Sequence, residues 1–271
     1  MRSLATAISV ALVWLCAQVP ASAATFTTDE LGTSITMAGE ITLGDAERLA
    51  AIFVTVKPIL SYYPYPNLLY LNSPGGDVSE AIRIADLVKT LGISVATVSE
   101  GKGACASSCF LIYAAALERS ASGIDTLRVE GTKGNLGPLG VHRPYLRVPA
   151  GGPAGASRQE QVMTDMRAYL VKASVGHALI DKMMSHASND IYWLNAEEVR
   201  ALGNFSPGVE EQLISKCGYN ARRESNLSAL DYIRSSQSGA GACIRYYMIK
   251  TYTPLLHTAV DRMRKGWRPW K

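Results

Sequence analysis

The stretch that decides the fold is Leu68-Leu69-Tyr70-Leu71-Asn72-Ser73-Pro74-Gly75-Gly76-Asp77. It reads as a buried strand that breaks into a glycine turn and opens a helix. Two adjacent glycines let a ligand approach bare main-chain N–H groups at a helix N-terminus, where the peptide dipoles favour negative charge. The turn is therefore either an ordinary strand-to-helix connection or an anion-binding turn of the oxyanion-hole type.

Strand and helix signals alternate on both sides of this turn. The expected strands are residues 34–41, 68–72 and 93–99, and the expected helices are residues 43–56 and 79–91. The second helix carries apolar residues at three- and four-residue spacing, with Gly92 at its C-cap position and Asp77 and Glu80 placed for a capping box. This alternation predicts an α/β architecture built from β–α–β units.

Two downstream segments carry side chains that could act together. Small residues precede Ser107 and Ser108, which stand just before the apolar helix signal of residues 109–115. A serine hydroxyl becomes a nucleophile when a base removes its proton and a prepared site holds the oxyanion, but either serine could equally be an N-cap or packing residue. His142, at the end of an apolar strand and two residues before Pro144, is a candidate base or a surface residue.

An acidic residue completes the set of candidates. Asp190 precedes an aromatic strand signal and the start of a helix at Asn195-Ala196-Glu197-Glu198. Its carboxylate could orient His142, or it could serve as a turn or cap residue. The residues alone leave both readings open.

The N-terminus has the layout of an export signal. Arg2 precedes an apolar run from residue 4 to residue 19, and Ala21-Ser22-Ala23 offers a signal-peptidase site. We expect cleavage after Ala23 and an exported protein, periplasmic or secreted; an uncleaved N-terminal membrane anchor is the alternative. The rest of the chain shows no apolar stretch long enough to span a membrane.

Four cysteines would remain after this cleavage, because Cys16 lies in the predicted signal peptide. An even number is expected for an exported protein with disulfides. We favour the pairs Cys105 with Cys109 and Cys217 with Cys243 among three connectivities. The four histidines and the cysteines show no metal-ligand spacing, so we expect no metal and no cofactor.

The order of these motifs resembles the branch of the ClpP/crotonase-like superfamily that holds ClpP and signal-peptide peptidase A. It looks closest to small exported Clp-protease-like proteins with a Cys-Ala-Ser-x-Cys motif, here residues 105–109. The resemblance covers residues 34–205 and implies a repeated β-β-α spiral. It implies Ser107 as nucleophile, His142 as general base, Asp190 as its orienting acid, and an oxyanion hole from Gly75 or Gly76 with Ser108.

The resemblance implies an exported serine hydrolase, a peptidase of ClpP or signal-peptide-peptidase type that works through an acyl-enzyme on a peptide or protein substrate. Because signal-peptide peptidases use lysine as base, Lys133 and Lys172 remain alternatives to His142. The alternative function is a non-catalytic protein of the same fold that binds peptides or a partner through the same cleft. A homo-oligomer is compatible with either function.

The predicted organisation is a signal peptide at residues 1–23, a ClpP/crotonase-like domain at residues 24–205 and a mainly helical appendage at residues 206–271. A formal net charge of +4 is too mild to indicate nucleic acid as a partner. The end of the chain is locally basic, with Trp267 and Trp270 among the charges. We expect a solvated, partly disordered tail there, with contact to anionic lipid as the alternative.

Overall fold

The computed structural model describes residues 23–30, 32, 34–55, 68–97, 104–121, 139–146, 153–220 and 239–270 of the 271-residue chain. The predicted signal peptide, residues 1–23, lies outside these ranges except for Ala23. Lys133, one of the alternative bases, also lies outside the described residues. Among the described helices, none is both long and apolar enough to cross a membrane.

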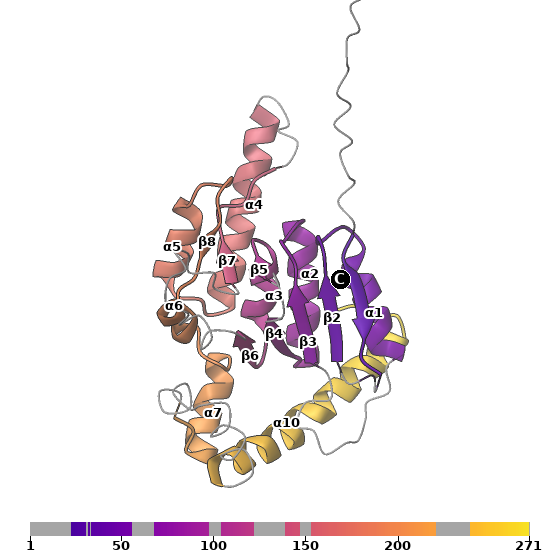
Figure 1. Cartoon of the computed structure of the whole chain (residues 1–271). Coiled ribbons are helices and arrows are strands. Elements are labelled where there is room, and N and C mark those ends of the chain that lie inside the picture. The colour runs from indigo at the N-terminus through magenta and orange to yellow at the C-terminus, as the bar shows by residue number, and fades with distance from the viewer. Residues whose placement is uncertain are drawn as a thin grey trace, which may run out of the picture.

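The larger sheet has five strands in the order β1-β2-β3-β4-β6 (Figure 1). Their bounds are Thr25–Thr28, Ser34–Ala38, Leu68–Asn72, Ser94–Thr97 and Arg119–Ala121. All neighbouring strands run parallel except β1, which is antiparallel to β2. The parallel pairing of β2, β3 and β4 confirms the β–α–β units expected from the sequence.

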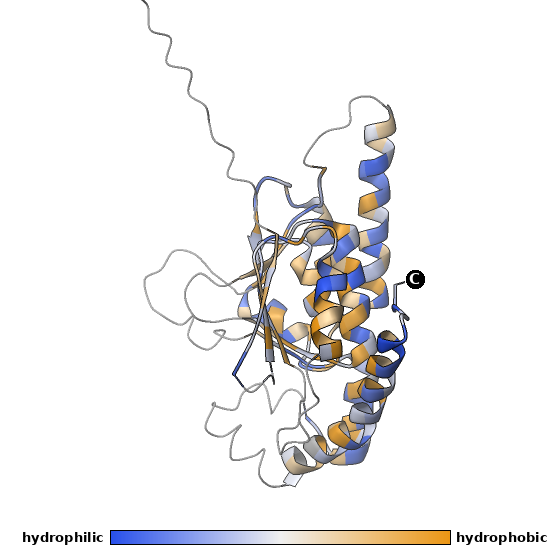
Figure 2. Cartoon of the chain, turned by 90° about the vertical axis from the view of Figure 1, so that its right-hand side faces the viewer, coloured by the Kyte–Doolittle hydropathy of each residue, from blue (hydrophilic) through white to orange (hydrophobic). Residues whose placement is uncertain are grey.

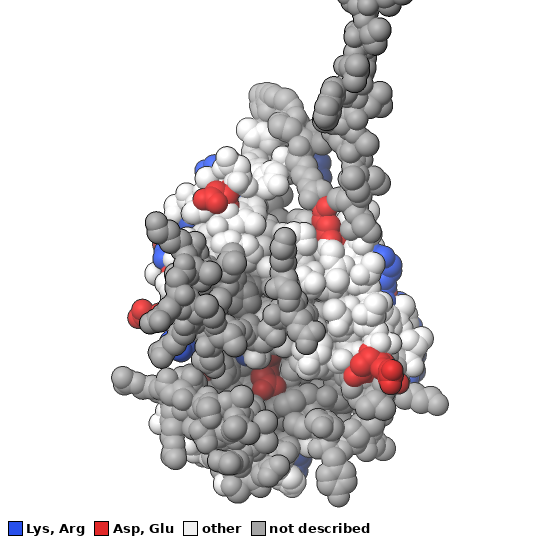
Figure 3. Space-filling view, in the orientation of Figure 1, with Lys and Arg blue, Asp and Glu red and all other residues white. Residues whose placement is uncertain are grey.

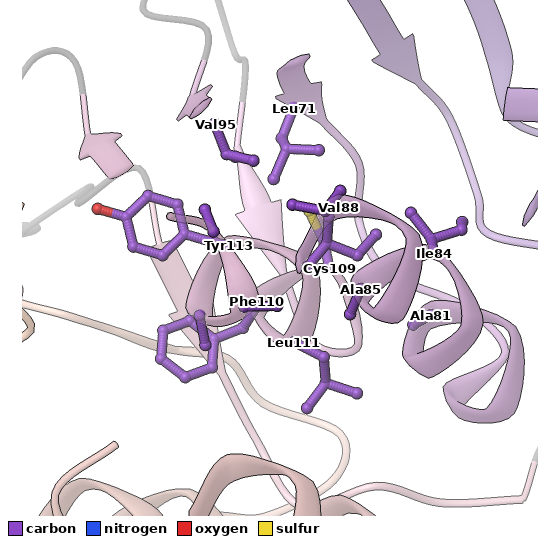
Figure 4. Packing of buried hydrophobic residues seen from close by; sticks show 14 of the residues in the cluster. Leu71, Ala81, Ile84, Ala85, Val88, Val95, Cys109, Phe110, Leu111 and Tyr113 are labelled. Atoms are coloured by element: carbon purple, nitrogen blue, oxygen red, sulfur yellow. The ribbon is translucent and has the colours of Figure 1, made fainter. Parts of the chain in front are cut away.

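The sheet packs one face against helices α1 (Asp45–Thr55), α2 (Val78–Leu91) and α3 (Cys109–Ala115), as the edge-on view of Figure 2 shows. Leu69 and Leu71 are fully buried on β3, whereas the alternate residues are partly exposed. Figure 4 shows Leu71 over the apolar side of α2 and the start of α3. Burying each leucine contributes about 1.5–3 kcal/mol, so this alternation fixes which face of β3 meets the helices.

Helix α2 begins at the glycine turn and has both predicted caps. The Asp77 carboxylate accepts a hydrogen bond from the Glu80 N–H at 2.7 Å, and Gly92 ends the helix in the left-handed conformation. The reciprocal half of the capping box is absent here, because the buried Glu80 carboxylate instead accepts from the N–H groups of Gly44 and Ala46. Glu80 thereby satisfies donors at the start of α1 and joins the two helices.

A smaller three-stranded sheet, in the order β5-β7-β8, lies beside the main one. Its strands are Cys105–Ala106, Leu139–Val141 and Tyr192–Trp193. β5 is parallel to β7, and β7 is antiparallel to β8. Hydrogen bonds link Ser73, in the glycine turn, to Ala104 and Ala106, so the turn after β3 adjoins β5.

The C-terminal half of the described chain is mainly helical. It contains α4 (Pro153–Lys172), α5 (His177–Ser185), α6 (Ala196–Ala201), α7 (Pro207–Cys217) and α10 (Gly239–Arg264). A disulfide joins Cys217 to Cys243, as predicted, and ties the end of α7 to the start of α10. From there α10 runs along the lower end of the main sheet to α1 (Figure 1).

The basic end of the chain does not form the solvated tail that the sequence predicted. Trp267 and Trp270 pack against the main core, the guanidinium of Arg83 lies 5.0 Å from the Trp270 ring centroid, and that of Arg262 lies 4.0 Å from the Trp267 ring centroid. The two indoles bury apolar area while the cations stack on their faces, and this favours docking over exposure.

Charged side chains are otherwise dispersed. On the face drawn in Figure 3, the described lysines and arginines lie apart from one another rather than in one patch. Two described acidic side chains, Asp45 and Glu80, are instead buried and paired with Arg48 and Arg83. Arg48 lies in the same helix as Asp45, and Arg83 in the same helix as Glu80, so each pair neutralises a buried carboxylate within its own helix.

Arg119 ties the main sheet to the segment that leads into α7. Its buried guanidinium donates to the main-chain oxygens of Ala114 at 2.9 Å, Leu202 at 2.5 Å and Gly203 at 3.1 Å. We expect Arg119→Ala to lower the free energy of unfolding by about 3 kcal/mol or more, because several buried carbonyls lose their donors. Urea unfolding measures the loss.

The matched control is Arg200→Ala, which removes an exposed arginine from α6. It should change the free energy of unfolding by less than about 0.5 kcal/mol. Equal losses in the two variants would contradict the structural role given to Arg119.

Candidate active site

Ser107 lies in the tight turn between β5 and α3 and has an unusual backbone conformation. Its φ is +56°, in the left-handed region that residues with a side chain rarely adopt. The turn is held by the Ser107 N–H, which donates to the Gly140 oxygen at 2.9 Å, and by the Ser107 oxygen, which accepts from Phe110 at 3.0 Å. Such strain costs about 1–3 kcal/mol and persists only where the surroundings impose it, typically at functional sites.

The predicted disulfide between Cys105 and Cys109 is present and encloses Ser107. The two Cα atoms are 5.3 Å apart, and both cysteines are fully buried beneath the turn. The bridge closes the chain two residues before and two residues after Ser107. It therefore limits the conformations available to the one serine whose backbone is strained here.

Gly75 lies against this turn and Gly76 against the main chain of Ile41, both so closely that neither position has room for a side chain. A Cβ on Gly75 would lie 2.6 Å from the Ser107 Cβ, and one on Gly76 would lie 2.1 Å from the Ile41 oxygen. Their φ values, +97° and +149°, also favour glycine. Gly75 of the predicted pair therefore lies directly against Ser107, and Gly76 is joined to the same turn by a hydrogen bond from Ser108.

The two glycines differ in the hydrogen bonding of their N–H groups. The Gly75 N–H donates to the Ser73 Oγ at 3.1 Å and is used within the turn. Among the described residues, neither the Gly76 N–H nor the Ser108 N–H has a hydrogen-bond partner. The Ser108 Oγ donates to the Gly76 oxygen at 3.1 Å and holds the two peptides together. Gly76 and Ser108 therefore offer two free donors, and Gly75 is the spacer that permits the close approach.

His142 directly follows β7, the strand beside β5. Ala106 pairs in register with Gly140, so Ser107 and His142 leave the same end of two neighbouring parallel strands. The side chain of His142 is buried, and its Nδ1 lies 2.8 Å from the Arg143 main-chain oxygen. A carbonyl oxygen can only accept, so in the neutral imidazole Nδ1 carries the proton and Nε2 keeps its lone pair. Within the described residues, neither the Ser107 Oγ nor the His142 Nε2 makes a hydrogen bond.

Asp190 does not contact His142, contrary to the orienting role that we predicted for it. Its side chain is 73% exposed, and its carboxylate lies 3.3 Å from Nε2 of His186. The antiparallel pairing of β7 and β8 places Val141 opposite Tyr192, and Asp190 lies two residues beyond that pair. The main-chain oxygen of Arg143 accepts the hydrogen bond from the Nδ1–H of His142 instead. A side-chain pattern cannot reveal such an acceptor, because every residue has a carbonyl.

Lys172, the other alternative base, ends α4 and is exposed, with its ammonium 5.9 Å from the ring centroid of Tyr169. That tyrosine is itself buried and hydrogen-bonded to Asp86 at 3.4 Å, and both burial and the nearby carboxylate raise the pKa of its phenol.

No group of three or more His, Cys, Asp or Glu residues in the described part of the chain could hold a metal ion.

Comparison with known proteins identifies the family. The model of the Clp protease family matches residues 33–124. ATP-dependent Clp protease proteolytic subunit 2 of Pseudomonas aeruginosa is 30% identical over 170 residues, which make up 60% of this chain and 76% of that protein. The chain belongs to the Clp protease family. With the α/β layers and helical C-terminal part, membership confirms the predicted ClpP/crotonase-like fold class.

Other relatives in the family are more distant. The ATP-dependent Clp protease proteolytic subunit of Bacteroides thetaiotaomicron is 26% identical over 154 residues, or 55% of this chain. The chain spans 60% of the length of that relative. Among solved structures, ClpP1 from Listeria monocytogenes is 21% identical, with a TM-score of 0.43 over 64% of this chain and 88% of that one.

The close contact between Gly75 and Ser107 gives a direct test of the site. We expect Gly75→Ala to lower the free energy of unfolding by about 1–3 kcal/mol, because the added methyl group overlaps the Ser107 Cβ and the Ala106 oxygen. Thermal and urea unfolding measure the change.

Gly208→Ala is the matched control. A Cβ at Gly208, in the first turn of α7, meets no atom within 4 Å. This variant should be neutral or more stable by up to about 1 kcal/mol, since alanine favours a helix over glycine. A Gly75→Ala protein as stable as the Gly208→Ala protein would rule out the close packing described here.

Proposed function

We propose that this protein is an exported serine peptidase of the ClpP type, which cleaves peptide bonds through an acyl-enzyme. The observation that carries the proposal is the strained Ser107 beside two unpartnered amides, those of Gly76 and Ser108. A nucleophile next to two prepared N–H donors is the arrangement that acyl transfer requires. Membership in a protease family supports the same reaction class.

The proposed reaction uses Ser107, His142 and the N–H groups of Gly76 and Ser108. The Ser107 Oγ attacks the peptide carbonyl carbon while Nε2 of His142 takes the hydroxyl proton. The carbonyl oxygen becomes an oxyanion that accepts hydrogen bonds from the Gly76 and Ser108 N–H groups. His142 then gives the proton to the leaving amine, and water, activated in the same way, releases the acyl group and restores Ser107.

Export is part of the proposal and rests on the apolar run with its Ala-Ser-Ala site before residue 24. The two disulfides are consistent with an oxidising compartment, where such bonds persist. We propose peptides or unfolded proteins as substrates, and homo-oligomer formation is compatible with this function. Contact of the basic C-terminal residues with anionic lipid remains a separate proposal.

One observation favours a second candidate, a non-catalytic peptide-binding protein of the same fold. Among the described residues, Ser107 and His142 are not hydrogen-bonded to each other, and the Asp190 carboxylate pairs with His186. Catalytic hydrogen bonds often form only in the substrate complex, so this geometry alone does not decide between the two functions. Reaction with an active-site probe does.

The test is labelling of the purified chain from residue 24 onward with a fluorophosphonate, which reacts with activated serines. We expect the unsubstituted protein to be labelled, Ser107→Ala to lose the label, and His142→Ala to react at least about 100-fold more slowly. Ser174→Ala is the control, because Ser174 is exposed and also has a positive φ, of +60°.

Three outcomes would contradict parts of the proposal. Labelling that persists in Ser107→Ala would overturn the nucleophile. Full labelling of His142→Ala together with loss in Lys172→Ala would move the base to lysine. An unlabelled, folded protein that still binds peptides would support the non-catalytic alternative.

Asp190 gives a further prediction. We expect Asp190→Asn to label at a rate within about threefold of the unsubstituted protein, because its carboxylate contacts His186 and not His142. Replacing the orienting acid of a working triad with the amide costs about 10⁴ in kcat. A loss of that size, measured as the labelling rate constant, would restore Asp190 to the triad.

A further inference from the structure

The main chain just after His142 is held by a side chain rather than by a strand. The Gln159 Oε1 accepts a hydrogen bond from the Leu146 N–H at 2.8 Å, and the Gln159 Nε2 donates one to the Pro144 oxygen at 2.5 Å. In a parallel sheet, one residue bonds to the carbonyl before and the amide after its partner residue. The Gln159 carboxamide thus takes the place of a strand residue opposite Tyr145.

These two hydrogen bonds restrain residues 142–146, a segment without regular secondary structure. β7 ends at Val141, and residues 142–146 lie in no strand or helix. The Arg143 N–H makes a longer bond, 3.3 Å, to the His186 oxygen. Among the described residues, Gln159 is the only partner of the Pro144 oxygen and the Leu146 N–H. The path of the chain after His142 therefore depends on one side chain of α4.

That path sets the state of the histidine ring. The Arg143 carbonyl that accepts the Nδ1 proton lies between the Arg143 N–H and the Pro144 oxygen, which are the anchored groups. If the segment moved, this carbonyl would rotate away from Nδ1, and the ring could change tautomer. A neutral imidazole in water prefers the proton on Nε2, which would leave Nε2 no lone pair to accept a proton in the proposed reaction.

We propose that Gln159 is a positioning residue for His142: by pairing with the main chain of residues 144 and 146, it holds the Arg143 carbonyl on Nδ1 and keeps Nε2 free to accept a proton. This inference rests on the proposed function for its catalytic consequence. The tautomer itself is a property of the resting protein and does not depend on activity. Gln159 thus carries the positional role predicted for Asp190.

The test compares Gln159→Ala and Gln159→Glu with Gln161→Ala. Glutamate keeps the acceptor for the Leu146 N–H but sets a carboxylate oxygen against the Pro144 carbonyl. Gln161 is the matched control, since it lies on the same helix and its side chain bonds, among the described residues, to the exposed Asp165 alone, at 2.7 Å. The probe is the same fluorophosphonate, with the maximal inactivation rate and the inhibition constant measured separately.

We expect both Gln159 variants to lower the maximal inactivation rate by about 10- to 100-fold, as small misplacements of a catalytic group do, with the inhibition constant within about twofold. Nitrogen-15 NMR of the histidine rings should show the Nδ1-protonated tautomer for His142 in the unsubstituted protein and in Gln161→Ala. The same signal should shift towards the Nε2-protonated tautomer in the Gln159 variants. Circular dichroism and urea unfolding confirm that each variant is folded.

The failure of this inference can be told from failure of the proposed function. If the unsubstituted protein is labelled at Ser107 but the Gln159 variants keep its rate and its His142 tautomer, Gln159 has no positioning role. If no variant is labelled, the proposed function fails, and the NMR comparison still decides whether Gln159 sets the tautomer. A tautomer that is Nε2-protonated in the unsubstituted protein would overturn the inference outright.

Discussion

The site depends on the contact between two turns, one carrying Gly75 and Gly76 and the other carrying Ser107. The glycine turn belongs to the main sheet and the serine turn to the smaller one, so this contact is also where the two sheets meet. There is no room for one more carbon atom between Gly75 and Ser107. Because the backbones touch, the Gly76 and Ser108 amides are held by the core of the protein rather than by mobile side chains.

The strained conformation of Ser107 coincides with three restraints. The residue lies against Gly75, its N–H donates to the Gly140 oxygen, and the bridge from Cys105 to Cys109 encloses it. Three independent restraints act on one residue. Most buried residues can shift slightly to relieve strain. The number of restraints on Ser107 indicates that the position of this residue is kept at a cost in stability.

The sequence predicted the elements of this site better than their connections. The two turns and both disulfide pairs could be located from the sequence because glycine and cysteine have distinctive chemistry at fixed spacing, whereas the roles of Ser107 and His142 stay predictions. Asp190 was chosen because a carboxylate is the familiar partner of histidine, yet the acceptor at Nδ1 is a backbone oxygen. Of the expected capping box, the half from the Glu80 N–H to Asp77 is present, but the Glu80 carboxylate accepts from main-chain N–H groups 34 and 36 residues away instead of from its own turn. Local sequence patterns can locate a candidate side chain, but its hydrogen-bond partners depend on tertiary contacts.

The docking of α10 and of the residues after it also bears on how the chain folds. Trp270 stacks under Arg83, which itself bridges Glu47 and Glu80 at the junction of α1 and α2. About 190 residues of sequence separate the indole from that guanidinium. A contact of such long range closes a large loop, which costs entropy. The β–α–β units pair over short stretches of chain, whereas the sides of α1 and α2 that α10 contacts can be covered only after nearly the whole chain has been made. The C-terminal end of the chain thus completes the packing of its N-terminal half.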